Sequence, residues 1–176
     1  FYKKGISYSE ISDKELYILP ILIRDNEIFI FNNNYFYEKW NEVYRNDLIE
    51  FILPLENIEI IQNINNSKYN LIDLDLVNLF KEYSDKSLAL VLIEESGRSY
   101  KKIYVKANIQ GKNISKNIKI EKQNLTLDNY YEEVIIRLKK ELINLVKSKN
   151  LIDIRTPSFL NVKLNLDKKT NLVELN

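Results

Sequence analysis

The sequence predicts a mixed α/β (α+β) domain organised around one central sheet, and three features of the chain support that prediction. First, three short runs are too apolar for half-exposed strands and too short for buried helices, which is typical of strands covered on both faces. Second, a later run alternates apolar and polar residues, as a strand with one solvated face does. Third, apolar residues recur at helical spacing between and after these runs. Together they indicate helices packed on a sheet of parallel and antiparallel strands.

The first buried strand is expected at residues 16–23, LYILPILI. Pro20 removes one backbone donor, so this strand needs a bulge or an unpaired position there. The residues Arg24 to Glu27 are typical of a turn, and the apolar run EIFIF follows them. We therefore expect the two runs to form a hairpin.

The next stretch, NNNYFYEKWNEVY, holds the only tryptophan and is predicted to form a helix over residues 35–46. Asn32 to Asn34 offer an N-cap, because an Asn side chain can accept from the free N–H groups of a first turn. The large apolar side chains then follow the spacing of one helical face: Phe36, Trp40, Val43 and Tyr44. A surface for stacking a ligand is the alternative, but rings that bind nucleic acid usually accompany a basic groove, and here acids are mixed in. The pattern favours a buried stripe.

A second buried strand is predicted at residues 48–53, closed by Pro54. A short helix at residues 56–65 and the polar linker NNSKYN follow it.

Asp73 is a candidate N-cap for a further helix over residues 74–84. The apolar face of that helix is Leu76, Val77, Phe80 and Tyr83. We expect Tyr83 to belong to the structural core together with Phe36, Trp40 and Tyr44. A third buried strand at residues 87–94 comes after this helix, so we expect it to lie parallel to the first strand through a right-handed crossover.

An antiparallel meander of three strands is expected over residues 87–120. Its middle strand alternates apolar residues with polar ones, and the apolar set is Ile103, Val105, Ala107 and Ile109. The longest helix is predicted over residues 129–148, with Thr126 or Asp128 as its cap. Its apolar side is Tyr131, Val134, Ile135, Leu138, Leu142, Leu145 and Val146.

The chain is predicted to divide into an α/β domain at residues 1–149 and the start of a second, truncated β unit at residues 150–176. The second part alternates cleanly and is expected to form a C-terminal β-hairpin. The chain begins at Phe1 without a signal-peptide pattern, so we expect a leader to be absent or already removed.

Composition argues against most catalytic devices. The chain has no His and no Cys, which excludes a Ser-His-Asp triad, a thiolate nucleophile and an ordinary zinc site. Its three glycines form no phosphate-binding loop. The 26 Lys and Arg balance 25 Asp and Glu, so no net field draws the molecule to nucleic acid or an anionic membrane. No run approaches the roughly 20 apolar residues of a membrane span. We expect a soluble chain that is not an enzyme and holds no cofactor or metal.

Two acidic pairs are candidate sites. Asp73 and Asp75 have the chemistry for a hard cation or an acid pair, but their i, i+2 spacing points them apart and Asp73 is already assigned as a cap. Glu94 and Glu95, with Arg98 in the following turn, stand at the end of a central strand, where α/β sheets often place their sites. A charged hairpin turn explains these three residues equally well.

One strand is a candidate surface for single-stranded nucleic acid. The segment SYKKIYVK interleaves tyrosines with lysines: Tyr100, Lys101, Lys102, Tyr104 and Lys106. A solvated strand face with extended lysines is the simpler interpretation. The glycine-aromatic signature of an RNA-recognition strand is also missing.

The order of these segments, GISYSEISDKELYILPI, NNNYFYEKWNEVY, LIEFILPLENIEII and LVNLFKEYSDKSLALVLIEE, resembles the bacterial, mainly proteobacterial, family labelled domain of unknown function 2066. The likeness covers about residues 5–149. The residues that fit are Asn34, Trp40, Leu53, Pro54, Leu55 and Tyr83. Asn57 and Ile60 stand where that family tends to have acids. The resemblance implies an uncharacterised, envelope-associated or periplasmic protein without a defined activity.

We therefore expect a non-catalytic binding or assembly module of a bacterial cell-envelope protein, with an unknown protein as its partner. The alternative is a nucleic-acid-binding domain that uses the strand from Tyr100 to Lys106. A third and weaker hypothesis is a metal-dependent enzyme that uses Glu94 or Glu95.

Overall fold

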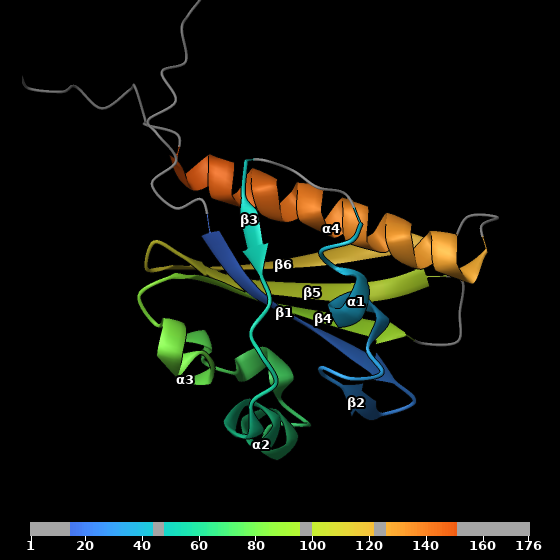
Figure 1. Ribbon diagram of the computed structural model, residues 1–176, viewed down its shortest axis with the longest axis horizontal. Helices are drawn as coiled ribbons and strands as arrows, with labels where there is room; N and C mark the ends of the chain where they lie inside the picture. Colours follow the sequence, from blue (N-terminus) through green and yellow to red (C-terminus); the bar gives the residue numbers. More distant parts are fainter. Residues whose placement is uncertain (1–14, 44–47, 96–99, 122–125, 151–176) are drawn as a thin grey trace, which may run out of the picture.

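The computed structural model describes residues 15–43, 48–95, 100–121 and 126–150, and its centre is one sheet of six strands (Figure 1). The strand order is β2-β1-β4-β5-β6, and β3 also pairs with β1. The strands are β1 (Glu15–Arg24), β2 (Glu27–Phe29), β3 (Glu50–Ile52), β4 (Ser87–Glu95), β5 (Tyr100–Ile109) and β6 (Lys112–Glu121). β1 lies parallel to β4, while β4, β5 and β6 form an antiparallel meander. Both arrangements confirm the predicted mixed fold.

The helices lie on both sides of this sheet. They are α1 (Tyr35–Lys39), α2 (Ile58–Asn66), α3 (Leu76–Leu79) and α4 (Leu127–Asn150), with two short 3-10 turns, η1 (Leu71–Asp73) and η2 (Lys81–Tyr83). α4 runs along one face, and α2 and α3 lie on the other side (Figure 1). None of the described helices is long and apolar enough to cross a membrane.

The face under α4 is a continuous apolar core. α4 begins after Thr126, one of the two predicted caps, whose hydroxyl accepts from the Asn129 N–H at 3.5 Å. The sheet contributes alternate residues of β5, all buried: Ile103, Val105, Ala107 and Ile109. The helix contributes the predicted apolar side, of which Val134, Ile135, Leu138 and Leu142 are fully buried. Each such side chain stabilises the fold by about 1.5 to 3 kcal/mol.

The predicted hairpin of β1 and β2 is present, and its turn residues Asp25 and Asn26 both have positive φ. β2 pairs only with the end of β1, and β3 pairs, in parallel, only with the start of β1. Pro20 lies in the gap between them. No strand pairs with β1 at Pro20 on this side, so the missing N–H breaks no hydrogen bond between strands. This agrees with the unpaired position expected at Pro20.

Asn34 closes that gap with its side chain and is fully buried. Its amide nitrogen lies 2.9, 3.1 and 3.0 Å from the carbonyl oxygens of Pro20, Phe29 and Ile30, to which it donates. Its amide oxygen accepts from the Phe36 N–H at 3.1 Å. One side chain therefore caps α1, as predicted, and also satisfies the backbone where the edge of β1 is unpaired.

Two predicted elements are shorter than expected. The helix predicted over residues 35–46 ends at Lys39, because the chain turns after Trp40 and the Val43 carbonyl accepts from Lys139 of α4 at 2.6 Å. The strand predicted as central at residues 48–53 is a three-residue edge strand in which Glu50 is exposed and Phe51 is buried. A short apolar run does not reveal whether its strand has a neighbour on one side or on both, so an edge strand can resemble a central strand in sequence.

The helix predicted over residues 74–84 is wrong in two respects. It is broken into α3 and η2, because Leu74 and Phe80 have non-helical backbone angles. The N-cap is Asp75 rather than Asp73, since the Asp75 carboxylate accepts from the Val77 N–H at 3.0 Å. The broken path still buries Leu76 and Phe80 against the sheet, whereas Val77 is 38% exposed.

The predicted core aromatics fall into three groups. Phe36 and Trp40 are fully buried on the α4 side, which confirms the interpretation of the NNNYFYEKW stretch as a core stripe. Tyr83 is half-buried and stacks on Tyr17 at 4.4 Å between ring centroids. Tyr44 lies outside the described residues, as do Arg98 and the predicted C-terminal hairpin.

Candidate functional site

Glu95, one of the predicted site residues, is the centre of an ionic cluster at the end of β4. It lies between Arg24 of β1 and Lys101 of β5, its register partners in the sheet. Arg24 Nε donates to Glu95 Oε2 at 2.8 Å, and Lys101 Nζ donates to Oε1 at 2.9 Å. Tyr131 of α4 also donates its hydroxyl to Oε1, at 2.7 Å. Both carboxylate oxygens are therefore engaged.

The protonation states of this cluster are fixed. Burial alone would raise the pKa of Glu95, but the hydrogen bonds from Tyr131, Lys101 and Arg24 lower that pKa to about 2. Burial and the bond to Glu95 raise the pKa of Tyr131 to about 12. At neutral pH these shifts keep the carboxylate ionised and the phenol protonated.

The cluster provides a counter-charge for the buried ammonium of Lys101. Its side chain is only 4% exposed, and its Nζ lies 4.1 Å from the ring centroid of Tyr131 and 5.5 Å from that of Phe36. A buried ammonium without a counter-charge is strongly destabilising. Glu95 supplies that charge, so the cluster closes the end of the core and has a structural role.

The two neighbouring glutamates do not form one acidic site. Glu94 and Glu95 are consecutive residues of a strand, so their side chains leave the sheet on opposite faces. Glu94 is exposed on the face away from α4. Within the described ranges there is no group of three or more His, Cys, Asp or Glu side chains that could hold a metal ion.

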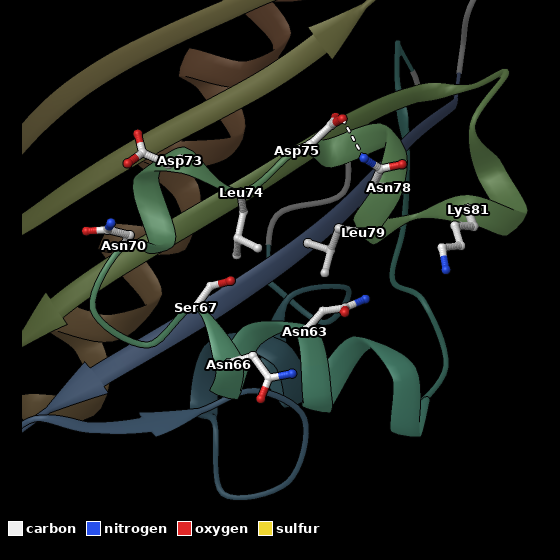
Figure 2. Close-up of a pocket in the computed structure, with 10 residues that line it drawn as sticks. All are labelled: Asn63, Asn66, Ser67, Asn70, Asp73, Leu74, Asp75, Asn78, Leu79 and Lys81. Carbon is white, nitrogen blue, oxygen red and sulfur yellow. Dashed lines mark hydrogen bonds between the residues drawn. The ribbon is translucent and has the colours of Figure 1, made fainter.

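A cavity of about 690 Å³ lies between α2, η1 and α3, and amide side chains such as Asn63, Asn66 and Asn70 line much of it (Figure 2). It includes the other acidic pair of the sequence. Figure 2 shows the carboxylates of Asp73 and Asp75 on either side of Leu74, pointing apart as their spacing predicted. The Asp75 carboxylate also accepts from the Asn78 side chain at 2.8 Å. The pair therefore does not converge on a common ligand.

The sheet face away from α4 is apolar and buried at β1 and β4 but polar and exposed at β6. Three rows of aligned residues cross it: Leu19, Leu90, Lys106 and Ser115; Ile21, Leu92, Tyr104 and Asn117; Ile23, Glu94, Lys102 and Lys119. The β1 and β4 members of the first two rows are buried under α2, η1 and α3. The β6 members of all three rows are exposed. The described helices therefore cover only half of this face.

A groove of about 610 Å³ follows the boundary between the covered and the uncovered half. We call it the open-face groove. The sheet side of the groove is formed by Leu92 and Tyr104, and its wall by Lys68 and Tyr69 with Leu71 and Ile72 of η1. Lys102 and Lys119 line its far side. It combines apolar surface with charged groups, as binding sites do.

Two hydrogen-bonded contacts hold the groove in shape. Lys106 Nζ donates to the carbonyl oxygens of Ile72 and Leu74 at 3.0 and 2.8 Å, which fastens the wall to β5. The Tyr104 hydroxyl and Ser115 Oγ lie 3.0 Å apart and are hydrogen-bonded, which ties the sheet side of the groove to β6. The groove is therefore built before any ligand arrives.

The residues predicted for nucleic acid do not share one surface. Lys101 lies on the α4 face and Lys102 on the opposite face. Lys106 is half-buried and engaged with the wall, which leaves Lys102 and Tyr104 at the groove. Tyr100 begins β5.

Sequence reasoning missed the groove residues contributed by other segments. Lys68, Tyr69 and Ile72 come from the linker region, where a tyrosine in an otherwise polar stretch was the available signal. Lys119 comes from β6, whose alternation of polar and apolar residues shows which side chains leave the α4 face. That these segments meet depends on tertiary structure alone.

Lys139 is a second buried cation on the α4 side. It is 3% exposed, and its Nζ lies 5.7 and 5.5 Å from the ring centroids of Trp40 and Phe51. Burial lowers its pKa to about 8. Nothing in the residue pattern distinguishes this position, since a lysine on a helix is usually solvated.

No family model and no curated protein matches the chain. Among solved structures, it is similar to an uncharacterised protein, with 13% identity over 77% of this chain and 91% of that one and a TM-score of 0.33. It is also similar to protein XCC0632 from Xanthomonas campestris, of the family DUF330, with 10% identity over 81% and 89% of the two chains and a TM-score of 0.32. At these scores neither neighbour bears on function.

Proposed function

We propose that this chain is a non-catalytic binding or assembly module and that the open-face groove is its binding surface. The observation that carries the proposal is the unequal cover of the sheet. On one face α4 and α1 pack a continuous core that reaches β5, whereas the described helices on the other face stop at β4 and leave a preformed groove beside β5 and β6. Preorganised surface that the fold itself does not use is what a binding module requires.

The strongly shifted ionisable groups support the non-catalytic part. Glu95 and Tyr131 bind each other and neighbouring cations, and Lys139 is buried against two rings. Each shift has a structural cause within the core of the α4 side. None of these three residues lines the open-face groove.

Placement in a bacterial cell envelope rests on the resemblance to domain of unknown function 2066. We expect a tagged protein, expressed from its complete reading frame in its own host, to fractionate with the envelope. A purely cytosolic pool would remove this part of the proposal without affecting the groove.

Crosslinking in the host tests the groove directly. A photoreactive phenylalanine analogue replaces Tyr69, which is 94% exposed at the groove, and in a matched variant it replaces Leu55, which is 81% exposed outside it. We expect a discrete protein adduct from position 69 and none from position 55. Equal adduct patterns from both positions would show that the groove is not a selective surface.

Single-stranded nucleic acid remains the second candidate, because Lys102 and Tyr104 lie together at the groove. This candidate predicts retention on single-stranded DNA or RNA that falls steeply as salt increases. No retention at low ionic strength would reject it.

A further inference from the structure

We draw no further inference here: the strongest candidate, the outer edge of β6, with which no described strand pairs, carries none, because nothing in the described part of the chain shows what covers it.

Discussion

The two faces of the sheet show how the same strands can serve folding on one side and binding on the other. On the α4 face the buried Lys101 is paired with Glu95, and the buried Lys139 donates to the Val43 carbonyl. On the opposite face the cover ends at β4, and two lysines stand opposite each other at the rim of a groove. The α4 face is therefore occupied by the core, whereas the open-face groove stays available for the proposed binding role.

The largest effect is expected from breaking the closed face at Trp40. This side chain is fully buried, and Trp40→Ala should lower the free energy of unfolding by about 3 to 5 kcal/mol. Urea denaturation measures the change, and Leu55→Ala, at a position 81% exposed, is the matched control. Trp40→Phe should cost less, because the Trp40 Nε1–H is buried without an acceptor among the described residues. A Trp40→Ala variant as stable as the control would place the ring outside the core.

Glu95→Gln should have the next largest effect, about 3 kcal/mol at pH 7, because it removes a carboxylate whose pKa is about 2 when folded and 4.5 when unfolded. A lowered folded pKa stabilises the protein fully above pH 4.5, and that contribution disappears as pH falls towards 2. Denaturation curves of both proteins from pH 7 to pH 2.5 would record a converging difference. A difference in unfolding free energy that stays constant with pH would show that the charge of Glu95 is not the cause.

Lys139→Met should act in the opposite direction and more weakly. The folded pKa of Lys139 is about 8 against 10.5 when unfolded, so below pH 8 the burial of the ammonium opposes folding. The variant removes that penalty but also the hydrogen bond to the Val43 carbonyl, and we expect a net gain of about 1 kcal/mol at pH 7. The gain should shrink between pH 8 and 10.5, as the wild type loses its proton on folding. A less stable variant at pH 7 would show that the Lys139 contacts outweigh desolvation.

Local patterns predicted most of the fold because local physics decides it. The run around Pro20, the cap at Asn34 and the face of α4 each follow from spacing and side-chain chemistry. The break at Leu74 could not be predicted, since Asp73 and Asp75 are equally suitable caps by residue type and only the structure shows that Asp75 accepts from the first turn.

The candidate site was predicted only in part. The sequence placed Lys102 and Tyr104 on a strand with one wet face, and both line the groove. It did not place Tyr69 or Lys119 beside them, because those residues come from separate segments that only the folded chain brings together. It also grouped Lys101 with Lys102, although alternation puts them on opposite faces.

The stability of a variant without the groove lysines tests the division between the two faces most directly. We replace Lys68, Lys102 and Lys119 together with Gln and measure the free energy of unfolding in urea at low salt. If these lysines serve binding, the variant should be about as stable as the wild type, because the ion pair of Lys119 with Glu121 that it loses is exposed and contributes little. A loss of more than about 1 kcal/mol would show that the lysines serve the fold, and the binding role of the groove would lose its basis.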